Sequence, residues 1–448
     1  MLPTGHYLVG GATAVATSFV LLAIVPASTI DRLASARLRL GSLGAVTPVP
    51  VSLACFVLLV VLLLAGLHGS RDPLANPLPT MVWTVWWVGI TLAHALFGNL
   101  WAYINPWTGP YRLLDRSLGG RLSRSPPLTY PAWLAYWPAI VFFFAFAWFE
   151  LVDPAPEDPA RLAYAVAGYW LATFAGMVVF GEAAWRERAE PFSIFYRLIA
   201  GLAPLVIEPS ASRQGSRQGR YELCIAIPGA ALVERGALPP SGVLFVLLTL
   251  SAVSFDGLSA TFWWLGLADI NPLEFPGRTE VMFLNTLGLV MTVIVLGAGF
   301  TAAIWLGWAL AGARGPVAPG LGTFVYSIMP IAIAFHFSHY LAALLIGSQY
   351  ALVAMSDPFA TGADLFGFGH INVITSFKAT FEGTRLIWNL QTAGIVVGHV
   401  AAVVLAHALA VRHFGDNRQA VLSQIPLAVL MVLYTALGLW LLSTPVAT

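Results

Sequence analysis

Two histidines stand three positions apart in an otherwise apolar stretch of the sequence, at His336 and His339. Residues three apart project from the same face of a helix, so this pair could supply two imidazole groups to one metal ion. Asp256 and His399 occupy two further apolar stretches. Neutral imidazoles combined with a carboxylate suit zinc, iron or manganese. A metal ion with three protein ligands and one open position generates hydroxide from bound water near neutrality, which is hydrolase chemistry.

Depth along the helices tests whether these groups could meet. With a rise of about 1.5 Å per residue, His336, His399 and Asp256 fall roughly 20, 18 and 21 Å from the inner ends of their helices. We therefore expect these three groups near the bilayer midplane, with His339 about one turn further out. Gly398, directly before His399, would let a neighbouring helix approach closely. Since ionisable groups are costly inside a bilayer, this set is where function is to be sought.

Other polar residues in apolar stretches have a simpler explanation, because hydrogen bonds between polar side chains also hold membrane helices together. We expect His94 and Asn99 to act in this way, and His407 to be structural. His6, His68 and His413 fall at the ends of apolar stretches, where a solvated imidazole needs no further role.

The elements that must position these groups are membrane-spanning helices. Of the 448 residues, 58% are hydrophobic and only 10% charged, which excludes a water-soluble globular protein. A spanning helix needs roughly 20 mostly apolar residues, and ten stretches meet that length. They are approximately 7–26, 49–67, 80–103, 129–150, 161–181, 241–266, 281–311, 323–347, 385–411 and 423–443. The fold class predicted is an all-α polytopic helical bundle forming one transmembrane domain over 1–448.

Basic residues set the expected orientation, because Lys and Arg are retained in cytoplasmic loops. If the loop after the first span is cytoplasmic, all but five of the 22 basic residues lie on the inner side. The five exceptions are Arg71, Arg161, Arg278, Lys378 and Arg385. Both termini are then expected on the outer side.

Two polar segments interrupt the spans. The first, 182–240, is expected to be a cytoplasmic loop in which 192–207 forms an interfacial or re-entrant helix and 221–233 a short hairpin. The second, 356–383, is expected to be an outer loop that could cover a cavity. Asp357 and Pro358 would end the preceding helix, and Gly362, Gly367 and Gly369 would make the loop mobile.

Several functions find no support in the motifs. The sequence has no Walker loop, dinucleotide fingerprint, GxSxG elbow or HExxH motif, and nothing indicates nucleic-acid binding. The two cysteines, Cys55 and Cys224, indicate neither a disulfide nor a metal motif. Lysine is nearly absent while Ala, Gly and Arg are abundant, which favours a bacterial source and the plasma membrane as the location.

Short stretches distributed from the third span to the end resemble bacterial membrane proteins named fenitrothion hydrolase. They are Asn105-Pro-Trp107, Gly109-Pro-Tyr-Arg-Leu-Leu114, Ser254-Phe-Asp-Gly257, His336-Phe-Ser-His-Tyr340, Ser356-Asp-Pro-Phe359 and Asp364-Leu-Phe-Gly367. The resemblance implies hydrolysis of organophosphate esters, although an insecticide is not the substrate for which such a fold would arise. It supplies no catalytic residues.

The leading hypothesis is a membrane hydrolase acting on a lipophilic phosphoester or related ester. In it Asp256, His336 and His339 are catalytic, and the same three residues with His399 bind a divalent metal, Zn, Fe or Mn. The lipid bilayer and a lipophilic small molecule are the expected partners. One alternative is a transporter in which the same groups relay protons. Another is a haem-binding redox subunit with His336 or His339 and His399 as axial ligands.

Overall fold

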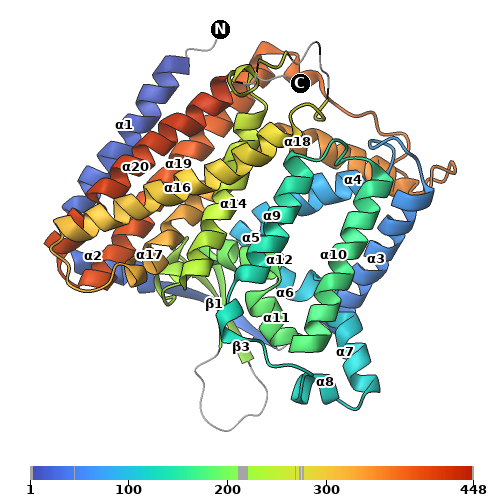
Figure 1. Ribbon diagram of the computed structural model, residues 1–448, viewed down its shortest axis with the longest axis horizontal. Helices are drawn as coiled ribbons and strands as arrows, with labels where there is room; N and C mark the ends of the chain where they lie inside the picture. The colour runs from blue at the N-terminus through green and yellow to red at the C-terminus, as the bar shows by residue number, and fades with distance from the viewer. Residues whose placement is uncertain are drawn as a thin grey trace.

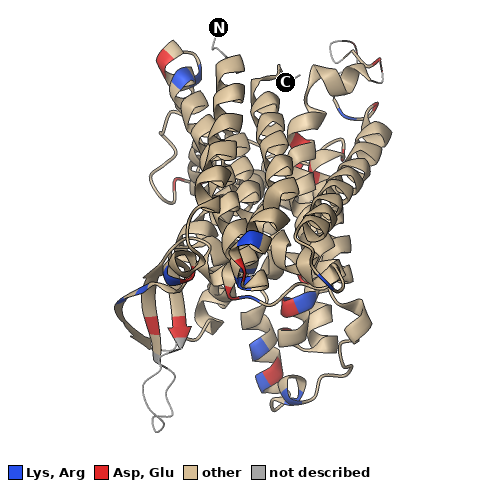
Figure 2. Ribbon diagram, turned by 90° about the vertical axis from the view of Figure 1, so that its left-hand side faces the viewer, with Lys and Arg blue, Asp and Glu red and all other residues tan. Residues whose placement is uncertain are grey.

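A computed structural model describes residues 4–44, 46–209, 220–267, 269–271, 274 and 277–445. Within this part of the chain, ten helices are long and apolar enough to cross a membrane. Both ends of the chain lie at one end of the molecule (Figure 1), which we call the terminus end. Figure 2 shows most of the Lys and Arg residues toward the opposite end, which we call the arginine-rich end. The prediction of an all-α polytopic bundle is confirmed.

Seven of the ten spans are single helices. They are α1 (Thr4–Ala23), α3 (Val49–His68), α10 (Pro159–Phe180), α14 (Pro240–Ser259), α16 (Met282–Leu310), α19 (Phe381–Phe414) and α20 (Asn417–Ser443). Most residues of α14 are buried. The other three spans are composite. They are α4 (Pro77–Thr80) with the π-helix η1 (Met81–Ile90) and α5 (Thr91–Phe97); η2 (Ala132–Leu134) with α9 (Trp137–Leu151); and α17 (Ala318–Phe324) with η4 (Val325–Ile328) and α18 (Met329–Ser356).

Local sequence explains where several helices begin and end. Asp158 accepts a hydrogen bond from the backbone N–H of Arg161 at the start of α10, and Asp416 does the same for Gln419 at the start of α20. These carboxylates satisfy backbone donors that have no partner within the helix. Gly415 ends α19 with a φ of +68°, a left-handed conformation that glycine adopts without strain.

The helix α18 is central to the bundle, because it contacts α19, α14 and η1. The close contact with α19 depends on Gly398, where an added Cβ would lie 2.1 Å from the Cβ of Ala334. The predicted close approach at this glycine is confirmed. On its other side α18 meets η1, and so it joins the helices at the left of Figure 1 to those at the right.

A small antiparallel sheet lies at the arginine-rich end. Its strands are β1 (Arg37–Gly44), β2 (Leu205–Pro209) and β3 (Arg220–Ala226), in the order β1-β3-β2. The expected hairpin over 221–233 is wrong, because β3 pairs with strands from two distant segments and Ala230–Val233 forms the short helix α13.

Short helices fill the remaining segments at this end. They are α2 (Ala27–Ser35), α6 (Trp101–Ile104), α7 (Thr108–Ser117), α8 (Arg121–Arg124), α11 (Glu182–Arg188), α12 (Pro191–Ile199) and η3 (Ala200–Leu202). All residues of α12 except Arg197 are buried, and its N-terminus is capped by the buried carboxylate of Glu190. This segment is therefore an interior helix rather than one lying on the membrane surface.

The segment between α18 and α19 contains one helical turn, η5 (Ser376–Lys378). The Asp357 carboxylate accepts hydrogen bonds from the backbone N–H groups of Thr361 (2.9 Å) and Gly362 (2.7 Å). Further along, Gln349 of α18 exchanges hydrogen bonds with both backbone groups of Ile374. The loop thus forms a local turn at Asp357 and is held against α18 at Gln349. Past α14, the short helix α15 (Phe262–Gly266) completes the terminus end.

Candidate functional site

The helices α9, α14 and α18 bring four ionisable side chains together. Asp256 lies three residues before the end of α14. Its Oδ2 atom is 2.9 Å from Nε2 of His339 on α18. Each of these two side chains keeps about a quarter of its surface exposed, 22% for Asp256 and 25% for His339. The pair can therefore be reached from outside the packed interior.

Tyr340 extends this pair into a chain of hydrogen bonds. Its hydroxyl oxygen lies 2.5 Å from Asp256 Oδ2 and 3.1 Å from Oε1 of Glu150, the next-to-last residue of α9. Arg278 donates a hydrogen bond of 2.5 Å to the backbone carbonyl of Glu150 and so fixes this end of α9. We call Glu150, Asp256, His339 and Tyr340 the carboxylate cluster.

The number of hydrogens in the carboxylate cluster is limited. A phenol has one hydrogen and can donate it to one acceptor at a time. If Tyr340 donates to Asp256, its contact with Glu150 is a hydrogen bond only when the Glu150 carboxyl carries a proton and donates it to the phenolic oxygen. His339 supplies a second donor to Asp256. The geometry is thus satisfied by an ionised Asp256 and a protonated Glu150.

His336 stands beside the cluster. Its Nε2 atom lies 3.1 Å from the carbonyl oxygen of Trp87 on η1, and its ring packs against that of Tyr340 with centroids 4.8 Å apart. The indole of Trp87 faces Glu150 and Tyr340, and its nitrogen has no well-aligned acceptor among the described residues. His336 and Trp87 therefore form the wall of the cluster on the side of η1.

His399 does not join the others. Its Nδ1 atom lies 2.8 Å from the carbonyl oxygen of Ile395 in its own helix, and its ring packs against Tyr434 of α20 at 6.1 Å. The hydroxyl of Tyr434 is hydrogen-bonded to Ser254. The structure thus places His399 in a separate contact between α19 and α20.

The predicted metal ligands are therefore not brought together as a set. Within the described ranges, no group of three or more His, Cys, Asp or Glu side chains is arranged to hold a metal ion. Of the predicted four, only Asp256 and His339 are in direct contact. The Nε2 atom of His336 is engaged with a carbonyl oxygen.

His94 has the structural role expected of it. Its Nδ1 atom lies 2.6 Å from the Ile90 carbonyl oxygen, and its Nε2 atom accepts a hydrogen bond of 2.8 Å from the backbone N–H of Trp101. The ring also stacks on Tyr196 of α12, with centroids 4.2 Å apart. His94 thus ties η1 and α5 to α6 and α12.

Two members of the carboxylate cluster, Glu150 and Tyr340, were not predicted from the sequence. Glu150 falls at the end of its span, where an acid is usually solvated, and Tyr340 is an aromatic residue of a kind common in such spans. The available signal was the adjacency of Tyr340 to His339 in the sequence.

The sequence stretches that carry the resemblance also have a spatial relationship. The stretches 254–257 and 336–340 meet at the carboxylate cluster through Asp256, His339 and Tyr340. Comparison with protein-family models, with curated proteins and with solved structures finds no match to this chain.

Proposed function

We propose that the protein is a proton-coupled membrane transporter in which the carboxylate cluster holds and passes the coupling proton. The observation that supports this is the position of the Tyr340 hydroxyl between two carboxyl groups, 2.5 Å from one and 3.1 Å from the other. A partly buried carboxyl pair bridged by a hydroxyl could store a proton and give it a short path between the two acids. Ionisable groups inside membrane proteins commonly mark such proton paths.

Coupling to transport follows from which helices the cluster joins. Glu150, Tyr340 and Asp256 belong to α9, α18 and α14 respectively. When Glu150 loses its proton, two negative carboxylates face each other across one hydroxyl, and the single hydrogen of Tyr340 can be donated to only one of them. The link from α18 to α9 or the link from α18 to α14 is then weakened, so the protonation state changes how these helices are held together. A cargo that binds one arrangement better than the other would shift the equilibrium between them.

The partly exposed faces of Asp256 and His339 give the proton a route in and out. Exposure of these groups to hydrocarbon would be costly, so we expect water at this opening. We further propose a lipophilic small molecule as cargo, the lipid bilayer as the surroundings, and the plasma membrane of a bacterium as the location.

Infrared spectroscopy of the reconstituted protein tests the stored proton directly. At neutral pH we expect the C=O stretch of a protonated carboxyl group, and we expect Glu150→Gln to remove it. Glu157→Gln, which changes an exposed acid at the same end of the molecule, is the matched control and should leave the band in place. If Glu150→Gln removes no band, the proposal is wrong.

Proteoliposomes that enclose a pH-sensitive dye then test transport. Addition of lipophilic weak acids and amines, one at a time, should reveal a compound that drives proton movement. That movement should be lost in Asp256→Asn and Glu150→Gln and kept in Glu157→Gln. Cleavage of an added ester without proton movement would favour the second candidate function instead.

The second candidate is hydrolysis of a lipophilic phosphoester. It is favoured by the meeting of the stretches 254–257 and 336–340 and by the His339–Asp256 pair itself. With Nε2–H donated to Asp256, Nδ1 of His339 can accept a proton from water as the water oxygen bonds to phosphorus. The bond from phosphorus to the leaving oxygen breaks, and that oxygen takes the proton from His339.

Release of 4-nitrophenol from diethyl 4-nitrophenyl phosphate measures this activity. Loss of a general base typically costs about 10²–10⁴ in rate, so His339→Gln should lower the turnover by at least about a hundredfold. His370→Gln, in the exposed loop between α18 and α19, is the control and should behave as the wild type. Equal turnover by the two variants would refute the hydrolytic role of His339.

A further inference from the structure

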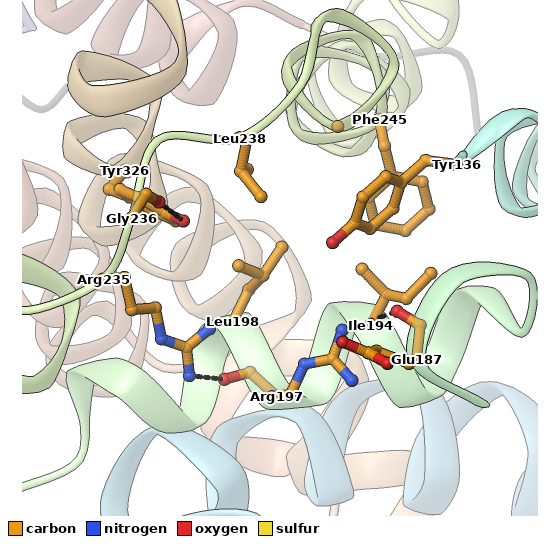
Figure 3. Close-up of a pocket in the computed structure, with 11 residues that line it drawn as sticks. Tyr136, Glu187, Ile194, Arg197, Leu198, Arg235, Gly236, Leu238, Phe245 and Tyr326 are labelled. Atoms are coloured by element: carbon orange, nitrogen blue, oxygen red, sulfur yellow. Dashed lines mark hydrogen bonds between the residues drawn. The ribbon is translucent and has the colours of Figure 1, made fainter. Parts of the chain in front are cut away.

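A cavity of about 450 Å³ opens at the arginine-rich end, away from the carboxylate cluster. Figure 3 shows the side chains that surround it. They come from α11, α12, the segment before α14, the start of α14, η4 and the segment before α9, and the charged ones are Glu187, Arg197 and Arg235. Small-molecule sites typically have volumes of roughly 300–1,000 Å³, so this cavity is large enough for a ligand.

The cationic side of the cavity has unused hydrogen-bond donors. Arg235 donates one hydrogen bond to the backbone carbonyl of Arg197 (2.9 Å), and Arg197 donates one to the carbonyl of Glu187 (2.8 Å). A guanidinium group has five N–H donors, so most of them remain free for a ligand. Neither arginine forms an ion pair within the described residues. With Glu187 as the one acid in the lining, the cavity carries a net positive charge.

A neighbouring cavity shows the contrast. It has a volume of about 280 Å³ and shares Glu187 and Arg197 with the first cavity. Its other two arginines, Arg112 and Arg186, both pair with Glu182, at 2.7 and 3.4 Å. The unpaired positive charge is thus concentrated where Arg197 and Arg235 meet.

The opposite walls of the cavity are apolar and aromatic. Ile194, Leu198, Leu238 and Phe245 supply the apolar surface. Figure 3 shows the hydroxyl of Tyr136 directed toward the space between these side chains. A ligand that fills the cavity would therefore need an anionic group at one end and an apolar group at the other.

We propose that this cavity binds an amphiphilic anion, a phosphate or carboxylate group attached to an apolar chain, whose charged group contacts Arg197 and Arg235. Guanidinium groups bind such oxyanions through paired hydrogen bonds. The anion has two sources of the same chemistry, the headgroup of an anionic membrane lipid or a soluble organic anion. The site does not depend on the carboxylate cluster.

Octyl phosphate is the probe for the first experiment, with the purified full-length protein in phosphatidylcholine nanodiscs. Its binding is measured by the rise in the thermal unfolding temperature as the probe is titrated. We expect saturable binding by the wild type, weakened about tenfold or more in Arg235→Gln and in Arg197→Gln. Arg314→Gln, which removes an exposed arginine elsewhere at the same end, should bind as the wild type.

Nanodiscs that contain phosphatidylglycerol distinguish the two sources. If this lipid displaces octyl phosphate, the natural ligand is a membrane lipid; if it does not, the ligand is a soluble anion. If Arg235→Gln fails to fold, as judged by circular dichroism and gel filtration, Arg197→Gln decides the matter alone. No saturable binding to the wild type, or equal binding by the folded arginine variants, would overturn the proposal.

Discussion

The phenolic oxygen of Tyr340 and the carboxylate of Asp256 lie 2.5 Å apart, although 84 residues separate them in the sequence. This contact joins α18 to α14, and the same hydroxyl reaches Glu150 on α9. Three spans are therefore connected through one hydroxyl group, whose hydrogen bonds depend on the charge of two acids. Helix packing alone would not require such a connection, since apolar side chains suffice to fill an interface.

Tyr340→Phe should separate the hydrogen bonds from the packing of the ring. The substitution keeps the ring but leaves both carboxyl groups without their shared partner. Hydrogen bonds to charged groups contribute about 1.5–3 kcal/mol, so we expect the free energy of unfolding to fall by about that amount, and the infrared band of Glu150 to shift. Tyr350→Phe is the control, because Tyr350 of the same helix has no side-chain hydrogen bond to a described residue. Equal stability of the two variants would show that the hydroxyl contributes nothing.

His399→Gln and His339→Gln should differ, although the sequence suggested one site for both histidines. His339 contacts Asp256 at 2.9 Å, whereas His399 packs against Tyr434. We expect His339→Gln to abolish proton-coupled transport and His399→Gln to retain most of it, as measured in proteoliposomes. A loss of the same size in both variants would mean that the two histidines act together.

The spans could be predicted from the sequence because hydrocarbon thickness fixes both the length and the composition of a spanning helix. Their contacts could not, since depth measured along a straight helix ignores tilt. An error of one turn, about 5.4 Å, is enough to exchange one histidine for another. Asp256 accordingly contacts His339. The histidine expected at the same depth as Asp256 was His336.

The partners of the predicted residues were harder to find than the residues themselves. Glu150 ends its helix, and its position in the sequence does not reveal that Arg278 and Tyr340 lie beside it. The cavity at Arg197 and Arg235 was hidden for the same reason, because its walls come from six separate segments. Gly398 was an exception, since a glycine within a long apolar helix directly indicates a close neighbour.

Gly398→Ala should destabilise the contact between α18 and α19. The added methyl group would lie 2.1 Å from the Cβ of Ala334 and 2.9 Å from the carbonyl oxygen of Pro330, so both helices must move apart. Overpacking of this kind typically costs about 1–3 kcal/mol, which unfolding in mixed detergent micelles would measure. Gly168→Ala in α10 is the control, because an added Cβ meets no atom within 4 Å there. An unchanged stability for Gly398→Ala would show that the two helices adapt without cost.

The turn after α18 should loosen in acid. The backbone N–H of Thr361 donates a hydrogen bond to the Asp357 carboxylate. This bond is the main reason why the pKa of the carboxyl lies below its ordinary value. A depressed pKa in the folded state stabilises the turn at pH values above the unfolded pKa of about 3.9. This stabilisation is lost as the pH falls through the lower folded pKa. We therefore compare the amide exchange rates of Thr361 and Gly362 in the wild type with the rates of the same amides in Asp357→Ala. The ratio of wild-type rate to variant rate should be low at about pH 5 and should rise as the pH falls toward about 3. The variant has no carboxylate to protonate, so a ratio that stays constant across this range would mean that Asp357 does not hold the turn.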